Sequence, residues 1–221
     1  MFELPLADGI TASFQRFPSP ETGLLARRPP SAGALPLCPG GNGGFVCALP
    51  EGEACWIGLT ARPGAATILV GVLAELSDGS RIDVLSGLRL TSAGTGGHLA
   101  TVHPVAWLSV PPSAQVVGIH RPGDGWQALC REPRPAAAGG NAGSAEALAM
   151  RLHLVVRPES DLARERRGGA VVQSQSRVPG RPVSKALRTA VELVDGFRFR
   201  QECGEPAPAP WPTVYGGWRL P

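Results

Sequence analysis

The stretch from Thr67 to Leu90 constrains the fold of this 221-residue chain more than any other. Two apolar runs containing β-branched residues flank the segment Ser-Asp-Gly-Ser at residues 77–80. Asp-Gly supplies the positive φ angles of a tight turn, so the stretch predicts an antiparallel hairpin. Pairing about this turn sets Leu73 opposite Val84 and predicts one continuous second strand as far as Leu90.

The rest of the chain has the composition of a protein built from many short strands. The 29 glycines and 23 prolines are spread between apolar runs, and 43% of the residues are hydrophobic. Turn-forming residues placed between short apolar runs are typical of sandwiches and barrels. We therefore predict an all-β, mostly antiparallel fold: a two-sheet β-sandwich, jelly-roll-like, with one helix near the C-terminus.

The helix is expected at residues 183–195. Apolar residues recur there at the spacing of one helix face: Val183, Ala186, Leu187, Ala190, Val191 and Val194. Pro182 suits the first helical turn, and Gly196 suits the position just beyond the end. This pattern predicts a helix that packs against the sheets.

Composition also divides the chain into one domain and a tail. Residues 1–203 are expected to form a single β-sandwich domain, with a flexible Ala- and Gly-rich connector at 133–145. Residues 204–221 form a Pro-rich tail that carries Trp211, Tyr215 and Trp218. Aromatic residues in a tail indicate docking on the same chain or on a neighbouring subunit, so these three are the candidate partner-binding residues.

A meander of three strands is expected at 99–110, 115–121 and 126–131, with turns at 111–114 and 122–125. Pairing across the first turn places His103, Trp107 and His120 on one face, with Gly118 opposite Trp107. Such an aromatic surface can stack on a sugar ring or anchor a protein partner. The candidate ligand-binding residues are these three and Trp126, which lies at the edge of the second turn.

These surfaces favour a non-enzymatic binding or assembly module that recognises a carbohydrate or other protein subunits. Two motifs that would indicate an enzyme are missing from the sequence: the Gly-x-Ser-x-Gly nucleophile elbow and the Gly-Lys-Ser/Thr phosphate loop. Sandwich folds host many functions, so the fold itself does not decide between them.

Two alternatives remain open. A small hydrolytic or metal-dependent enzyme would use His103 and His120, with Asp83 or Asp124 as the nearest carboxylate. Nucleic-acid binding would use the Arg-rich segment 157–200, because residues 151–200 carry 11 basic and 5 acidic side chains. The basic residues are mixed with acidic ones, so a solvated face is favoured over nucleic-acid binding.

Cysteine usage and the N-terminal pattern bear on cofactors and location. The cysteines are loosely spaced and odd in number: Cys38, Cys47, Cys55, Cys130 and Cys203. This spacing predicts buried free thiols in a reducing compartment, with no metal and no cofactor. No secretory signal pattern and no membrane-length apolar run is present in the sequence. The expected location is the cytoplasm or an assembled particle.

Overall fold

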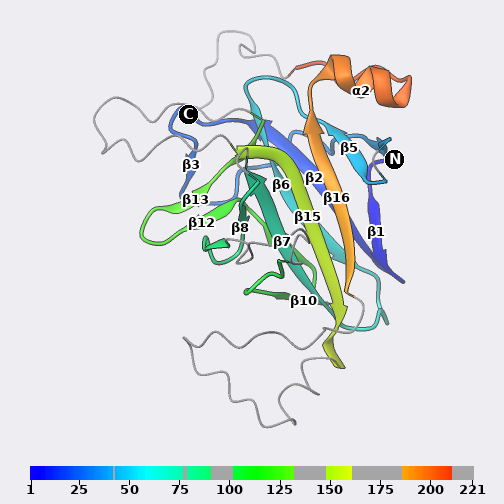
Figure 1. Cartoon of the computed structure of the whole chain (residues 1–221), viewed down its shortest axis with the longest axis vertical. Helices are drawn as coiled ribbons and strands as arrows, with labels where there is room; N and C mark the ends of the chain where they lie inside the picture. Colours follow the sequence, from blue (N-terminus) through cyan, green and yellow to red (C-terminus); the bar gives the residue numbers. More distant parts are fainter. Residues whose placement is uncertain (42, 77–78, 91–101, 132–147, 161–185, 211–221) are drawn as a thin grey trace, which may run out of the picture.

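The chain folds into sheets that are mostly antiparallel, with one complete helix among the described residues (Figure 1). The computed structural model describes residues 1–41, 43–76, 79–90, 102–131, 148–160 and 186–210. The prediction of a mostly-β chain is confirmed. Within the described ranges, no helix combines the length and the apolar character needed to cross a bilayer.

The first sheet has five strands in the order β1-β2-β6-β11, and β14 pairs with a second stretch of β6. Its strands are β1 (Leu4–Ala7), β2 (Ile10–Pro18), β6 (Glu53–Ala61), β11 (Ala114–Val116) and β14 (Leu129–Cys130). All of its pairs are antiparallel. The long β2–β6 pair forms its centre.

The second sheet is larger, with eight strands in the order β4-β5-β16-β15-β7-β8-β9 and β10 on β7. Its strands are β4 (Leu37–Pro39), β5 (Phe45–Ala48), β7 (Ile68–Leu76), β8 (Arg81–Asp83), β9 (Arg89–Leu90), β10 (Leu108–Val110), β15 (Leu148–Pro158) and β16 (Leu187–Val194). The β16–β5 pair is parallel, whereas the other pairs are antiparallel. Figure 1 shows β7, β15 and β16 as long neighbouring arrows.

Apolar side chains from the two larger sheets share one core. Phe14 and Ile57 from the first sheet and Val72 and Leu154 from the second are all 0% exposed, and all belong to the same cluster. Burying one such side chain contributes roughly 1.5–3 kcal/mol relative to leaving it in water. This core holds the two sheets together.

A third, three-stranded sheet lies beside the first. It consists of β12 (Ile119–Arg121), β13 (Gly125–Gln127) and β3 (Leu24–Leu25). The turn predicted at 122–125 joins β12 to β13, and Arg121 pairs with Gly125. Beneath this sheet lies a second, smaller apolar cluster formed by Phe17, Leu25, Ala54, Trp56 and Ala128.

The prediction of a helix at 183–195 is wrong over the described part of that range, because Leu187–Val194 is the strand β16. The helix α2 (Gly196–Cys203) follows it. In β16, Val191 and Leu193 enter the core with a period of two. The same apolar residues also fit helical spacing, so the partners β15 and β5, distant in sequence, decide the outcome.

Helix α2 begins and ends at residues whose chemistry suits a helix terminus. The Asp195 side chain accepts a 2.8 Å hydrogen bond from the Arg198 backbone N–H at the N-terminus. Gly204 ends the helix with φ of 72°, and its N–H donates to the Arg200 carbonyl. Phe199 anchors the helix in a third apolar cluster with Val46, Ala48 and Val194.

A disulfide joins Cys38 of β4 to Cys203 at the end of α2, 165 positions apart in the sequence. This corrects the expectation that the cysteines are free thiols. The spacing gave no signal, because the fold alone brings these two Cα atoms within 6.0 Å. Cys47, Cys55 and Cys130 lie outside the disulfide, and burial raises the pKa of the Cys47 and Cys55 thiols, which keeps them neutral.

Removing the disulfide is expected to destabilise the protein. Cys203→Ser should lower the free energy of unfolding by about 2–5 kcal/mol, because a crosslink that closes a long loop restricts the unfolded chain. Denaturant titration without reductant measures this change. Cys130→Ser is the matched control because it leaves the disulfide intact. Equal stabilities of Cys203→Ser and the wild type would contradict the prediction.

Candidate functional site

Polar side chains cover the side of the second sheet that faces away from the core. Leu152, Leu154 and Val156 of β15 point into the core, so the residues between them point outward. Outward residues of β7, β15 and β16, with neighbours from β8 and α2, form what we call the outer polar strip. It consists of Glu75, Arg81, Arg151, His153, Arg157, Arg188, Glu192 and Arg198.

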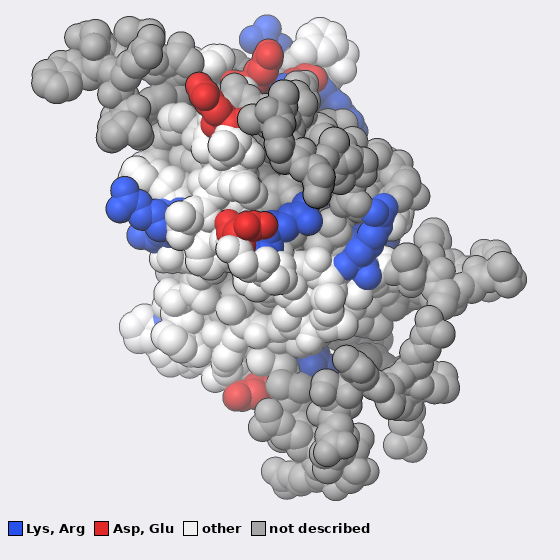
Figure 2. Space-filling view, turned by 90° about the vertical axis from the view of Figure 1, so that its left-hand side faces the viewer, with Lys and Arg blue, Asp and Glu red and all other residues white. Residues whose placement is uncertain are grey.

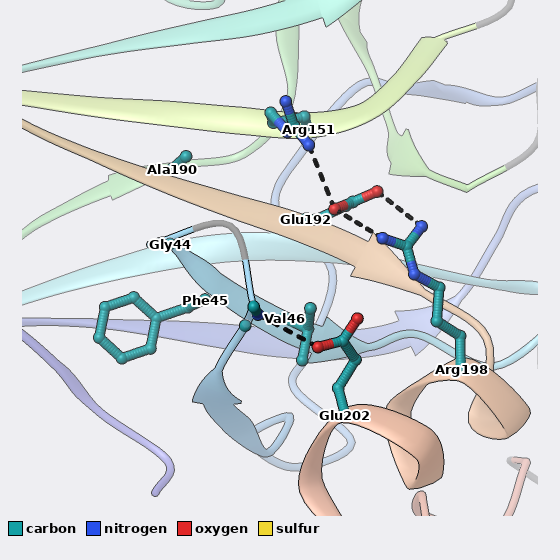
Figure 3. Close-up of a pocket in the computed structure, with 10 residues that line it drawn as sticks. Gly44, Phe45, Val46, Arg151, Ala190, Glu192, Arg198 and Glu202 are labelled. Carbon is teal, nitrogen blue, oxygen red and sulfur yellow. Dashed lines mark hydrogen bonds and ion pairs between the residues drawn. The ribbon is translucent and has the colours of Figure 1, made fainter.

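One end of the strip lies beside α2 and is electrically compensated. The Glu192 carboxylate accepts hydrogen bonds from Arg198 at 2.7 and 3.0 Å and from Arg151 at 3.4 Å (Figure 3). Glu202 of α2 accepts a bond from the Gly41 N–H across the same pocket. The pocket volume is about 70 Å³, room for only a few water molecules. It is too small for a drug-sized ligand.

The middle of the strip centres on Glu75. Its carboxylate lies 2.8 Å from Nε2 of His153 and 3.3 Å from Arg81. Burial by itself raises the pKa of Glu75, but the His153 and Arg81 contacts outweigh burial and hold that pKa below its usual value. Burial lowers the pKa of His153 despite the bond to Glu75, so the neutral imidazole donates to the carboxylate.

At the other end of the strip, Arg157 and Arg188 lie near His103 and Trp107 of the segment 102–107; we call these four residues the basic end. The Arg157 guanidinium lies 4.2 Å from the centre of the Trp107 ring, a cation–π contact. Arg188 donates to the carbonyl of Val102. Burial, together with the charges of Arg188 and Arg157, lowers the pKa of His103.

Asp83 fixes the segment 102–107 that carries two residues of the basic end. One carboxylate oxygen of Asp83 accepts from the N–H groups of Val105 at 2.6 Å and Ala106 at 2.9 Å. The other accepts from Leu85 and Ser86, both at 3.0 Å. Asp83 itself is 0% exposed. Four backbone donors thus surround one buried carboxylate.

The same carboxylate explains why the predicted hairpin differs from the structure. Asp83, instead of Val84, pairs with Leu73, and the second strand ends there instead of continuing to Leu90. An aspartate whose side chain bonds to the backbone N–H groups two and three residues later favours a turn over a strand.

Gly71 of β7 makes room for the segment that Asp83 holds. Because Gly71 has no Cβ, Pro104 and Trp107 occupy the space beside it.

The structure lacks the hairpin that was expected to place His103, Trp107 and His120 on one face. The first hairpin of the meander is absent, since β10 pairs with β7 and β11 pairs with β6. Trp107 packs against Arg157, and the charge of Arg157 also acts on His103. His120 instead pairs with Trp126 in the third sheet.

Trp126 lies in β13 of that third sheet, and Gly118 directly precedes β12. Trp126 packs against the second apolar cluster. A Cβ on Gly118 would meet the backbone of Gln127 and the Cβ of Trp126, so Gly118 makes room for β13 and not for Trp107. Trp126 therefore has a packing role in the described structure.

No family model matches the chain. Neither the curated proteins nor the solved structures give a match. Among the described residues, no group of three or more His, Cys, Asp and Glu side chains is placed to hold a metal ion.

The tail residues Trp211, Tyr215 and Trp218 and the connector 133–145 lie outside the described residues. The part of the tail before them returns to its own chain. The carbonyl of Ala209 accepts a 2.8 Å bond from Arg16, which is buried and paired with Glu53.

Most of the arginines that the nucleic-acid hypothesis would use lie outside the described residues. Arg164, Arg166, Arg167, Arg177 and Arg181 lie outside the described residues, whereas Arg188 lies in the basic end. Figure 2 shows the side of the molecule near β3, β12 and β13, where described acidic and basic groups are interspersed on a mostly uncharged surface. The described residues of this side form no continuous basic stripe.

Sequence reasoning missed Arg157 beside Trp107, and it named Arg188 only for nucleic-acid binding. Both lie in the Arg-rich segment, where no turn or motif distinguished them. The register that pairs Arg188 with Val155 brings them onto one face of the sheet. Alternation within residues 151–157, with apolar residues at every second position, was the available signal.

Removing the Asp83 carboxylate is expected to destabilise the fold severely. Asp83→Ala should cost at least about 3 kcal/mol, because it leaves four backbone N–H groups without their acceptor. Asp83→Asn should cost less, since its amide retains one oxygen acceptor. Urea denaturation of both variants measures the order. An Asp83→Ala protein as stable as the wild type would contradict the role of this carboxylate.

Stability is expected to fall on acidification, first through His153. Its folded pKa lies below the unfolded value of about 6.5, so the unfolded chain binds more protons as the pH falls through that value. The free energy of unfolding then decreases with pH. Glu75, whose pKa is also lowered, adds a further loss below about 4.5.

The variant His153→Gln tests this, because glutamine can donate to Glu75 and does not titrate. Urea denaturation between pH 7.5 and 5 should give a smaller dependence of stability on pH than in the wild type. An unchanged dependence would contradict the assignment to His153.

Proposed function

We propose that the protein is a non-enzymatic binding or assembly module, a jelly-roll-like β-sandwich, which recognises a carbohydrate or another protein subunit through the basic end. The observation that carries this proposal is the partly buried Trp107 packed against Arg157. Trp and Arg are the residues that most often dominate the binding energy of recognition surfaces. Val105 beside them is 55% exposed and extends the apolar surface.

The rigidity of this surface supports binding. Trp107 is held by Arg157 over its ring and by the backbone bonds of Asp83 to the neighbouring Val105 and Ala106. A side chain that is fixed before a ligand arrives loses little conformational entropy on binding.

The packing of the turn-rich segment 18–44 and of the first part of the tail favours ligand binding over assembly. Leu25, Leu35 and Leu37 of that segment are buried in their own chain, and the carbonyl of Ala209 in the tail is bonded to Arg16. Segments that pack on their own chain are not available to a neighbouring subunit. Of the two expected ligands, a carbohydrate is therefore the better supported.

The disulfide bears on where such a module works. Disulfides persist in oxidising surroundings and on particle surfaces, and are rare in the cytosol. Of the two expected locations, the bond between Cys38 and Cys203 favours an assembled particle over the cytoplasm.

Screening against a panel of immobilised glycans, with Trp107→Ala alongside the wild type, tests the proposal. The loss of an aromatic anchor should weaken binding to any glycan that the wild type retains by roughly tenfold or more. Phe197→Ala is the matched control, because Phe197 is an aromatic residue on α2 that is 73% exposed. Equal binding by the two variants would overturn the assignment to Trp107.

Light scattering of the eluting protein separates the assembly form of the proposal from the ligand form. A monomer of about 23 kDa supports a ligand-binding module. A defined oligomer, whose mass is unchanged by Trp107→Ala, would instead place the contact elsewhere.

A further inference from the structure

We infer that the disulfide between Cys38 and Cys203 is a redox switch, whose reduction releases α2 and uncovers an apolar patch of Val46, Ala48 and Val194. The inference goes beyond the proposed function and does not rest on it, because α2 lies at the opposite end of the outer polar strip from the basic end. The switch couples the covering of this patch to the redox state of the surroundings.

Helix α2 depends on its contacts with the sheet, because its eight residues are too few for a stable helix in water. Phe199 is its one buried side chain, at 1% exposed, whereas Phe197 is 73% exposed. Among the described residues, the shared core of the two larger sheets includes none from α2. The sheets can therefore keep their core when the helix leaves.

The polar contacts of α2 with the sheet are open to solvent. Arg198, whose side chain is 37% exposed, bonds to Glu192, and Glu202 accepts an exposed 3.2 Å bond from the Gly41 N–H. Figure 3 shows both contacts beside the pocket between α2 and β5, so the helix is not close-packed against the sheet on this side. Ion pairs and bonds in contact with water contribute little to stability.

The disulfide fixes the end of the helix. At its start α2 continues from β16, and Asp195, whose side chain is 51% exposed, lies 3.6 Å from Arg131. At its end Cys203 is tied to Cys38 of β4, the edge strand of the second sheet. Both cysteines are partly exposed, so a reductant can reach the bond. Breaking the bond removes a covalent tether and leaves the hydrogen bonds of the sheet in place.

The reductant that this switch takes is a dithiol. One thiolate of the dithiol attacks a sulfur of the protein disulfide, forms a mixed disulfide and releases the other cysteine. The second thiol of the reductant then closes its own disulfide and releases the first cysteine. The dithiol thereby gives up two electrons and two protons, and the protein ends with two thiols. Because disulfides are rare in the cytosol, release of α2 follows entry into a reducing compartment.

Hydrogen exchange of the full-length protein, followed by mass spectrometry before and after treatment with dithiothreitol, tests the inference. Reduction should speed exchange at residues 196–203 by roughly tenfold or more, because a crosslink contributes at least that factor to the equilibrium that it constrains. The amides of β2 should stay protected, because the core around them contains no described residue of α2. A dye that fluoresces on apolar surfaces should bind more strongly to the reduced protein.

Two full-length variants assign the effect to this bond. Cys203→Ser should show fast exchange at residues 196–203 without any reductant. Cys130→Ser is the matched control, because it keeps the disulfide. It should match the wild type both before and after treatment with dithiothreitol.

Three results would overturn the inference. If thiol titration shows complete reduction while α2 stays protected, the helix is held without the bond. If β2 loses its protection together with α2, the bond supports the whole fold and is not a switch. If dithiothreitol leaves the bond intact in the folded protein, no reductant reaches it.

Discussion

The pairing of β15 between β7 and β16 is the constraint on which both the core and the candidate site depend. Nine registered pairs join β15 to β7, and six join it to β16. Because side chains alternate along a strand, this one register sends Leu154 into the core and His153 onto the outer face. A slip of one residue would exchange the two sets. The same hydrogen bonds therefore specify the hydrophobic centre and the charge pattern on the surface.

The parts of the fold that could be predicted are those specified by local sequence. The apolar run of β7 and the turn between β12 and β13 were predicted because alternation and turn chemistry act over a few residues. The strand β16 was not, because its apolar residues satisfy two periodicities. Only the neighbours β15 and β5, far away in the sequence, select the extended form. The disulfide between Cys38 and Cys203 was hidden for the same reason.

The hairpin expected to bring His103, Trp107 and His120 together is not the arrangement of the structure. Trp107 packs against Arg157, the charge of Arg157 acts on His103, and His120 pairs with Trp126. The partner that positions their segment is Asp83, whose role depends on a loop approaching from elsewhere in the chain. A single Asp inside an alternating strand gives no local sign that it will bind four backbone N–H groups, two from residues just after it and two from a distant loop.

The outer polar strip is hard to explain by stability alone. Partly buried ion pairs such as Glu192 with Arg198 lose hydration as they form, and apolar residues of similar volume are often as stabilising. At the other end, burial and the charges of Arg188 and Arg157 lower the pKa of His103, so the neutral imidazole is favoured beside these two arginines.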